Sequence, residues 1–274
     1  MQDKTAISER RACRLLGLAR SVLQYEPCQS PGNDELRSRI VELAAERRRF
    51  GYRRIHVLLR REGRLANVKR VHRLYRQSQL QVQRRRRRQR VAVEREPLVL
   101  PAAPNQVWSM DFVMDALHNG RRLKCLTIVD DFTKEAIDIA VDHGISGMAV
   151  TCALDRAALF RGLPKTIRTD QGPEFTSKAL DQWGYRRGVH LKLIEPGKPI
   201  QNAFIESFNG RFRDECLNDH YFESLAQARI VIAAWRRDYN EQRPHSALEY
   251  QTPAQFAARC RAKRPDSAHN KDIL

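Results

Sequence analysis

Three acidic residues stand in settings that suit chemistry better than a solvated surface. Asp111 interrupts the apolar run Trp-Ser-Met-Asp-Phe-Val, Asp170 opens Asp-Gln-Gly-Pro-Glu-Phe, and 35 residues separate Asp170 from Glu206. A carboxylate inside an apolar strand is costly unless it has a partner. Carboxylates are the ligands that Mg²⁺ prefers, and a metal pair can activate a nucleophile and stabilise the leaving oxygen of a phosphodiester. We interpret Asp111, Asp170 and Glu206 as catalytic acids that converge to bind Mg²⁺ or Mn²⁺.

Each acid also has a simpler interpretation. Asp111 could be a structural group with a buried partner, and Asp170 could merely start a turn. Glu206 could be an ordinary surface charge of its helix. Three neighbouring acids, Asp130, Asp131 and Glu174, compete for the same roles. Asp131 is expected to be a turn residue, and Glu174 is expected to line the site without binding metal.

A helix that Asn202 opens as N-cap is predicted to carry Glu206. Phenylalanine recurs at every fourth position of this helix and forms one apolar stripe, made of Phe204, Phe208 and Phe212. Glu206 then lies on the opposite face, close to Asn209 and Gly210. A glycine on such a polar face lets another backbone approach closely.

The charge of the chain is strongly positive and unevenly distributed. The net charge is +18, and residues 1–100 alone hold 26 Lys and Arg against 10 Asp and Glu, a net of +16. Such asymmetry indicates a polyanionic partner, of which nucleic acid is the commonest. The alternative is a soluble protein that is merely rich in arginine.

Three helices are predicted in the basic region, over 35–48, over 52–61 and after the N-cap residue Asn67. Arginine occupies most of the positions opposite the apolar faces, which is typical of a helix-turn-helix DNA-binding module. The alternative is a small bundle whose arginines only solvate it. The DNA-contacting residues predicted here, together with the arginine run that follows, are Arg53, Arg54, Lys69, Arg70, Arg73, Arg84, Arg85, Arg86, Arg87 and Arg88.

From Gln106 onward the pattern changes to strand, strand, strand, helix, strand, helix, strand, helix, which predicts an α/β domain with a mixed sheet flanked by helices. The helix over 147–160 is expected to bury one face. The residues expected on that face are Ala149, Cys152, Ala153, Ala157 and either Leu159 or Phe160.

The predicted organisation has six parts. They are an N-terminal helical segment and linker (1–33), the helix-turn-helix module (34–80), a basic linker with three prolines (81–105), the catalytic core (106–222), a C-terminal helical extension (223–262) and a disordered tail (263–274). The six cysteines form no CxxC pair, which favours reduced thiols in a cytosolic protein. No apolar run reaches the length of a membrane span.

Residues 34–256 resemble the second-frame (OrfB-type) catalytic subunit of bacterial insertion-sequence transposases, within the retroviral-integrase-like DDE group. The matching motifs are Trp108-Ser-Met-Asp-Phe112, Arg168-Thr-Asp-Gln-Gly-Pro-Glu-Phe-Thr-Ser177, the 196–217 stretch and Tyr239-Asn-Glu-Gln-Arg-Pro-His-Ser-Ala-Leu248. The chain departs from many relatives in having Arg168-Thr169 where they have His-Ser. It also lacks the zinc-binding N-terminal domain of retroviral integrases.

The resemblance implies an RNase H-like core with a five-stranded mixed sheet and the triad Asp111, Asp170 and Glu206. It also implies metal-dependent DNA cleavage and strand transfer at element ends, with DNA contacts that include Arg213; we add Asn209 and Lys198. The partners expected are the terminal inverted repeats, target DNA, an upstream-frame (OrfA-type) protein or fusion, and further copies of the chain. The expected location is the bacterial cytoplasm, at the nucleoid. The alternatives are a non-catalytic DNA-binding regulator and an RNase H-type nuclease.

Overall fold

The computed structural model describes residues 8–24, 32–82, 101–194 and 202–262. Lys198, the run Arg84–Arg88 and the predicted tail over 263–274 lie outside the described residues. Among the described helices, none combines the length and the apolar composition needed to cross a membrane.

The N-terminal segment contains two short helices, α1 (Glu9–Leu15) and α2 (Arg20–Leu23). Gly17, at a φ of +64°, lies between them, as expected from the break in the sequence pattern. These helices bury only Cys13, so they contribute little to a core.

The three predicted helices of the basic module are present as α3 (Asn33–Glu46), α4 (Tyr52–Arg61) and α5 (Val68–Gln77). They enclose a core of their own, whose most buried members are Ile40, Ile55, Leu59, Val71 and Leu74. Asn67 caps α5 as predicted, since its side-chain oxygen accepts a hydrogen bond from the amide of Lys69 at 2.8 Å.

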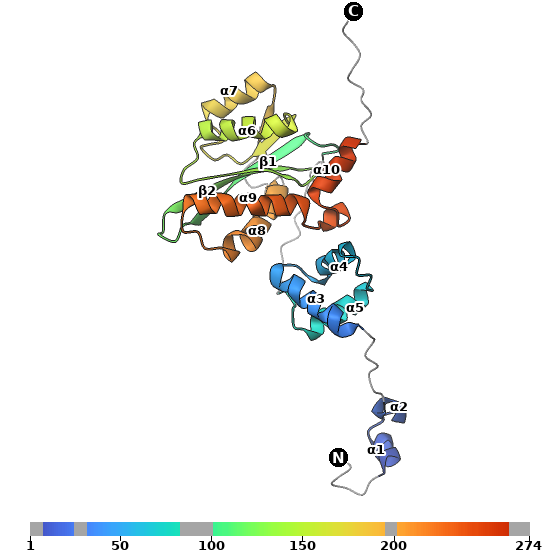
Figure 1. Cartoon of the computed structure of the whole chain (residues 1–274). Coiled ribbons are helices and arrows are strands. Elements are labelled where there is room, and N and C mark those ends of the chain that lie inside the picture. Colours follow the sequence, from blue (N-terminus) through green and yellow to red (C-terminus); the bar gives the residue numbers. More distant parts are fainter. Residues whose placement is uncertain (1–7, 25–31, 83–100, 195–201, 263–274) are drawn as a thin grey trace, which may run out of the picture.

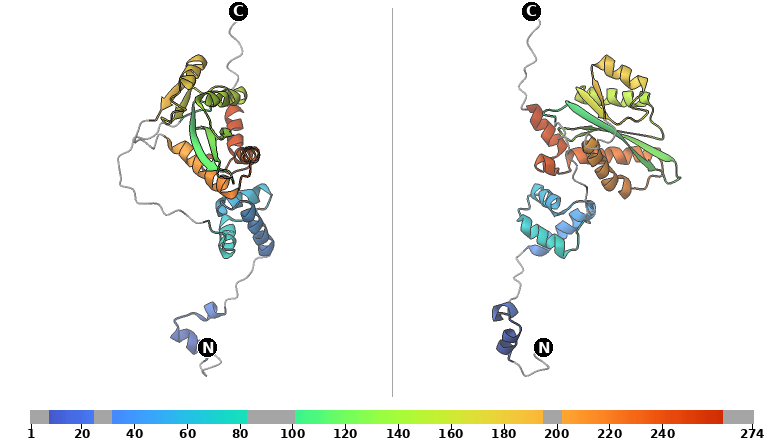
Figure 2. Two further views of the ribbon diagram at one scale, coloured as in Figure 1. Left: turned by 90° about the vertical axis from the view of Figure 1, so that its left-hand side faces the viewer. Right: turned by 180° about the vertical axis from the view of Figure 1, so that it is seen from behind.

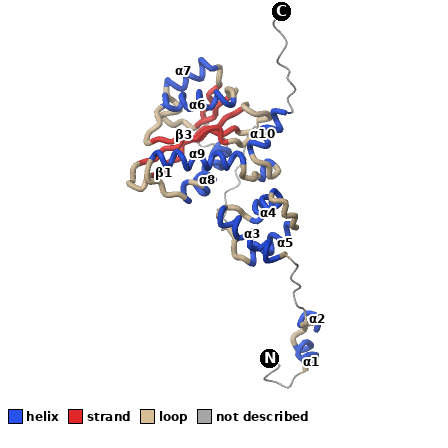
Figure 3. Tube along the Cα trace, viewed as in Figure 1, coloured by secondary structure: helices blue, strands red, loops and turns tan. Residues whose placement is uncertain are grey.

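The catalytic core is built on a five-stranded mixed sheet, as expected (Figures 1 and 3). The strands are β1 (Val107–Ala116), β2 (Arg122–Asp130), β3 (Ala136–Asp142), β4 (Thr166–Thr169) and β5 (His190–Leu193), in the spatial order β3-β2-β1-β4-β5. The first three strands form an antiparallel meander, and β4 and β5 add in parallel beside β1. Parallel neighbours require crossovers, which the intervening helices provide.

Helices cover both faces of this sheet (Figure 2). One face packs against α6 (Gly147–Arg161) and α7 (Lys178–Arg187). The other packs against α8 (Ala203–Glu215) and α9 (Leu225–Glu241). The short helix η3 (Leu217–Asp219) lies between α8 and α9, and after α9 the chain continues through η4 (Ser246–Leu248) to α10 (Pro253–Ala262).

The prediction for the buried face of α6 was right for Ala153 and Ala157 and wrong for Ala149, Cys152, Leu159 and Phe160. The helix buries Val150 and Leu154 together with Ala153 and Ala157, whereas Leu159 and Phe160 are 82% and 84% exposed. Cys152 is exposed as well. The helix is apolar on most sides, so its periodicity does not determine which face meets the sheet.

The helix-turn-helix module docks against the C-terminal extension through its arginines. Arg47, directly after α3, forms a two-bond ion pair with Asp238 of α9, with N–O distances of 2.5 and 2.6 Å. Arg61 at the end of α4 donates to the carbonyl oxygens of Gln242 and Tyr250. Part of the basic surface predicted to face outward therefore contacts the core domain.

Candidate active site

Strand register brings Asp111 and Asp170 to one face of the sheet. In the parallel pair of β1 and β4, Ser109 lies opposite Arg168, and each aspartate comes two residues further along its strand. Residues two apart on a strand point to the same face. This is the face that α8 covers, because Val113 of β1 and Ile205 of α8 belong to the same hydrophobic cluster.

Asp111 is a partly buried carboxylate with few partners. Its Oδ1 accepts a hydrogen bond from the amide of Phe112 at 2.7 Å, and its Oδ2 accepts one from Asn209 at 2.8 Å. Burial, together with the negative charges of Asp170 and Glu206, raises the pKa of Asp111 to about 6, although both hydrogen bonds oppose the rise. Asp111 therefore lies within electrostatic reach of both other acids.

Glu206 lies exposed in the first turn of α8, as the helix prediction required. The details of this helix differ from expectation. Asn202 occupies the N-cap position, but its backbone angles (φ −103°, ψ 2°) are not extended and its side chain caps no amide. The apolar stripe is formed by Ile205, Phe208 and Phe212, whereas Phe204 is only partly buried.

Asn209, one turn after Glu206, links α8 to the sheet. Its Nδ2 donates to Oδ2 of Asp111, and its Oδ1 lies 2.9 Å from the hydroxyl of Thr127 on β2. Thr127 lies directly opposite Asp111 in the β1–β2 pair and is fully buried. Gly210, the next residue, is exposed, and a Cβ there would meet nothing within 4 Å, so its surface is open.

Asp170 starts a tight turn directly after β4. Its Oδ1 accepts a hydrogen bond from the amide of Gly172 at 3.0 Å, and a Cβ on Gly172 would lie 3.1 Å from that same oxygen. The loop that follows is pressed against the start of α6, where a Cβ on Gly147 would lie 2.0 Å from the hydroxyl of Ser177. Glycine at these two positions thus allows the loop to hold Asp170 in place.

Glu174 anchors the same loop to the opposite face of the sheet. It forms an ion pair with Lys124 of β2, which is 7% exposed, and this bond lowers the pKa of Glu174. The ammonium of Lys124 also lies 3.9 Å from the ring centroid of Phe112, which stacks on Phe175 at 4.8 Å. Glu174 therefore has a partner among the protein's own side chains.

Asp131 begins the turn after β2, as the sequence suggested, and it is also buried. Asp130, the last residue of β2, holds this turn, because its Oδ1 accepts from the amides of Phe132 and Thr133. Asp131 pairs with Arg168 of β4 at 3.0 Å. Burial raises the pKa of Asp131, while the nearby Ser109 and the charge of Arg168 oppose that rise. Arg168, which replaces the histidine of many relatives, thus forms a buried ion pair two residues before Asp170.

Lys134 was not singled out from the sequence, yet it contacts the start of α8. Its Nζ lies 3.5 Å from the ring centroid of Phe204 and donates to the carbonyl oxygen of Asp131. Burial lowers the pKa of Lys134 to about 8. A cation over an aromatic face is favourable, and here it ties the turn after β2 to the helix of Glu206. An exposed-looking lysine in a turn gives no local signal of this contact.

The donor set fits a divalent cation in its chemistry. Asp111, Asp170 and Glu206 supply hard oxygen ligands, and no ion pair with a described residue neutralises any of them. Within the described ranges, no group of three His, Cys, Asp or Glu side chains is close enough together to hold a metal ion. The three acids are therefore near one another without forming a closed ligand set.

The predicted DNA contacts fall in different surroundings. Arg213 is exposed on α8, and its guanidinium donates to the carbonyl of Met114 at 3.0 Å. Lys69, Arg73 and Arg53 are exposed on the module, whereas Arg54 is partly buried near the C-terminal extension. Arg70 donates to Oδ1 of Asn33 at 2.9 Å. Contact of these residues with DNA stays a prediction.

Comparison with known proteins agrees with this architecture. Models described as "Integrase core domain" match residues 101–199 and 187–253, and one described as "HTH-like domain" matches residues 31–88. The solved structure of the simian T-cell lymphotropic virus intasome in complex with PP2A regulatory subunit B56 gamma aligns with a TM-score of 0.55 at 15% identity, covering 86% of this chain and 78% of that chain. That likeness concerns the fold alone.

Two sequence relatives indicate the family. The chain is 69% identical to the uncharacterized 31.7 kDa protein of insertion element IS407 from Burkholderia multivorans, covering 100% of this chain and 99% of the relative. It is 28% identical to the transposase for insertion sequence element IS904 from Lactococcus lactis, covering 76% and 87% of the two chains. The chain belongs to the family of insertion-sequence transposases built on an integrase core domain.

Proposed function

We propose that the chain cuts DNA at the ends of its insertion sequence and joins the freed 3′-hydroxyl to target DNA, with Asp111, Asp170 and Glu206 binding Mg²⁺ or Mn²⁺. One observation carries the proposal: the pKa of Asp111 is raised by burial and by the charges of both other acids, while no described cation pairs with any of the three. Unneutralised acids of this kind favour a divalent cation. Integrase-core enzymes depend in general on divalent metal ions.

When bound, such ions make a water or a 3′-hydroxyl nucleophilic and stabilise the leaving oxygen. In the first step, the oxygen of a water forms a bond to phosphorus, the phosphodiester P–O bond breaks, and a 3′-hydroxyl is released. In the second step, that hydroxyl oxygen bonds to a phosphorus of the target strand, and the bridging oxygen leaves and takes up a proton.

The chain's own side chains hold the catalytic carboxylates in position and contact the DNA during these steps. Asn209 holds the carboxylate of Asp111, and the Gly172 amide holds that of Asp170. Arg213 and Asn209 are our candidates for contacts with the bound DNA end, and Lys198 belongs with them. The helix-turn-helix module supplies the sequence-reading surface through Lys69, Arg70, Arg73 and Arg53, and the arginine run Arg84–Arg88 contacts the DNA backbone.

The test removes one carboxylate at a time. Asp111→Asn, Asp170→Asn and Glu206→Gln should each abolish strand transfer while leaving DNA affinity unchanged. Asp181→Asn, which changes an exposed aspartate on α7, is the matched control and should keep full activity. Strand transfer that persists in any of the three variants would remove that residue from the active site.

Assembly belongs to the same proposal. We infer that the protein acts at the nucleoid as a dimer or larger complex on DNA, and that it needs an upstream-frame protein or a fusion with it. A supercoiled-plasmid assay in Mn²⁺, with and without the upstream-frame protein, distinguishes a catalytic protein from a DNA-binding regulator. If neither arm nicks or joins DNA, the regulator is the better description; an RNA–DNA hybrid substrate in the same assay tests RNase H-type cleavage.

A further inference from the structure

A groove of about 870 Å³ lies between the helix-turn-helix module and the C-terminal extension. From the module it is lined by the first turn of α4 and by α5, and from the extension by η4 and the turn after it. We call it the interdomain groove and define it by Arg49, Arg53, Arg54, Arg76, Ser246 and Tyr250. Its described lining contains four arginines and no carboxylate.

The groove differs from the rest of the module because its described lining offers the arginines no carboxylate partner. Elsewhere on the module Arg39 is paired with Glu62, Arg64 with Glu35, and Arg47 with Asp238. Within the described part of the chain, Arg49, Arg54 and Arg76 have no such carboxylate. The groove is therefore a concentrated positive surface rather than a face of neutralised ion pairs.

Arg54 is the most constrained of these cations. It is partly buried, and its guanidinium lies 5.3 Å from the ring centroid of Phe50. Burial and the charge of Arg243 lower the pKa of Arg54 to about 10. Glu215 is already bound by Arg243 through two hydrogen bonds of 2.5 and 2.6 Å. A guanidinium held next to another cation is stabilised by an external anion.

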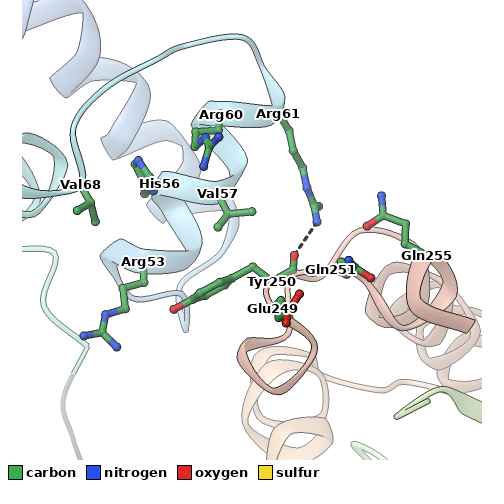
Figure 4. A pocket seen from close by; sticks show the side chains of 10 residues that line it. All are labelled: Arg53, His56, Val57, Arg60, Arg61, Val68, Glu249, Tyr250, Gln251 and Gln255. Atoms are coloured by element: carbon green, nitrogen blue, oxygen red, sulfur yellow. Dashed lines mark hydrogen bonds between the residues drawn. The ribbon is translucent and has the colours of Figure 1, made fainter. Parts of the chain in front are cut away.

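The extension's side of the groove is built by a strained turn. Glu249 and Tyr250 are consecutive non-glycine residues at φ values of 54° and 63°. Such backbone angles persist only where surrounding contacts impose them, and they cluster at functional sites. Arg61 holds this turn against α4 by donating to the carbonyl of Tyr250, whose ring projects toward Arg53 (Figure 4).

The polar groups that accompany the arginines suit a phosphodiester backbone. Tyr250 and Ser246 bring hydroxyl groups from the extension, and Tyr52 brings one from α4. Hydroxyl and guanidinium donors are the usual contacts to DNA phosphates, and they position DNA without reading its sequence. The helix α4 also begins here without a side-chain cap at Gly51, and such a terminus favours anions.

We propose that the interdomain groove binds the phosphate backbone of duplex DNA, so that one DNA segment contacts the helix-turn-helix module and the C-terminal extension together. This inference rests on the proposed function, since it assigns the path of the DNA that the transposase binds. The module then serves to fix the DNA relative to the core domain, because both walls of the groove are already joined by Arg47 and Arg61.

The experiment places a negative charge on the extension's wall. Ser246→Asp adds a carboxylate inside the groove, while Ala247→Asp adds one to the neighbouring exposed residue, which does not line it. Binding of the full chain to a fluorescein-labelled 30-base-pair duplex of random sequence is measured by anisotropy in EDTA. Ser246→Asp should weaken binding about three- to tenfold at 100 mM salt, and Ala247→Asp should leave it within about twofold.

A second variant tests, by the salt dependence of DNA binding, whether Arg54 contacts a phosphate. Arg54→Gln should reduce the slope of log K against log salt by about 0.9, the loss of one phosphate contact. Arg186→Gln, which removes an exposed arginine of α7, should leave the slope unchanged. Thermal unfolding of each variant shows whether Arg54→Gln still folds, and the exposed Ser246 variant remains informative if it does not.

The outcomes separate this inference from the proposed function. If Ser246→Asp binds DNA as tightly as the wild type, the interdomain-groove inference is wrong, because DNA would then not reach the extension. This holds whether or not Arg54→Gln weakens binding. Failure of the triad variants to abolish strand transfer would refute the catalytic assignment instead. The binding assay in EDTA is independent of that result, since no cleavage takes place in it.

Discussion

The amide of Asn209 joins the helix that carries Glu206 to the carboxylate of Asp111. Its Nδ2 lies 2.8 Å from Oδ2 of Asp111 on β1, and its own helix carries Glu206 one turn earlier. The hydroxyl of Thr127 lies 2.9 Å from the Asn209 oxygen and 3.0 Å from the carbonyl of Asp111. The hydroxyl of Thr127 has one proton to donate. When it donates this proton to Oδ1 of Asn209, the NH₂ group of Asn209 faces the carboxylate of Asp111.

Replacing Asn209 with leucine should therefore weaken metal binding more than DNA binding. Partners that orient metal ligands are typically worth about 10- to 100-fold in metal affinity or activity. We expect Asn209→Leu to require about tenfold more Mn²⁺ for half-maximal strand transfer, and to bind Mn²⁺ correspondingly more weakly by calorimetry.

Thr127 provides the control for this effect. Thr127→Ser keeps the hydroxyl and should behave as wild type, whereas Thr127→Val should shift the Mn²⁺ requirement in the same direction as Asn209→Leu. If Asn209→Leu lowers DNA affinity and leaves the Mn²⁺ requirement unchanged, Asn209 is a DNA contact, as the sequence also suggested, and does not position Asp111.

The ion pair between Glu174 and Lys124 should stabilise the loop that follows Asp170. Glu174→Gln leaves the buried ammonium of Lys124 without its carboxylate, which should cost about 2 kcal/mol in the free energy of unfolding. The double variant Lys124→Met with Glu174→Gln should recover much of that loss. Urea denaturation of Glu174→Gln, Lys124→Met and the double variant measures these free energies of unfolding. Equal losses of stability in the single and double variants would argue against the pair.

The same pair has a defined pH dependence. The bond to Lys124 lowers the pKa of Glu174 below its ordinary value of 4.5. A depressed carboxyl pKa contributes stability that is present above the unfolded value and is lost as pH falls through the folded value. The acid limb of the stability profile below pH 4.5 should therefore be less steep in Glu174→Gln.

The sequence predicted helices and strands well where a turn signal and a clear apolar face coincided. The helix Tyr52–Arg61 appears with the predicted bounds, because a turn at Gly51 precedes a clear apolar face of Ile55 and Leu59. The three predicted strands of the meander are present as well. Asp111 was recognisable because a carboxylate inside such a strand conflicts with its apolar neighbours.

Long-range partners could not be predicted in the same way. Arg168 and Asp131 are 37 residues apart, and nothing near Asp131 in the sequence indicates its buried ion pair. The contact of Lys134 with Phe204 likewise depends on how α8 crosses the sheet. The contacts of Arg47 and Arg61 could not be predicted for the same reason, since their partners lie in the C-terminal extension. Periodicity specifies a face, but it does not specify what covers that face.

Docking of the helix-turn-helix module should depend on the pair of Arg47 and Asp238. Their side chains are 33% and 25% exposed, and the geometry is bidentate. A double-mutant cycle with Arg47→Gln and Asp238→Asn should give a coupling energy of about 1–2 kcal/mol. The exposed pair of Arg229 and Asp142 serves as control and should give about 0.5 kcal/mol or less. Coupling energies that do not differ between the two pairs would exclude a docking role for Arg47.

His245 should make the folded protein sensitive to mild acid. It is 5% exposed, it packs against the Tyr239 ring at 4.7 Å, and its Nε2 has no hydrogen-bond partner among the described residues. Burial, with the charges of Arg243, Arg211 and Arg54, lowers the pKa of His245 from 6.5 to about 2. The folded state thus keeps His245 neutral where the unfolded chain takes up a proton.

Below pH 6.5 the unfolded state binds one more proton than the folded state. The free energy of unfolding therefore falls as pH falls, by on the order of 1 kcal/mol per pH unit. Urea denaturation at pH 7.5, 6.5 and 5.5 should show this slope in the wild type and a flatter one in His245→Gln. The raised pKa of Asp111 contributes the opposite slope in this range, but it does so in both proteins and cancels in their difference. His190→Gln, a change at an exposed histidine, should keep the wild-type slope. An unchanged slope in His245→Gln would mean that the buried imidazole is protonated in the folded state despite its three arginine neighbours.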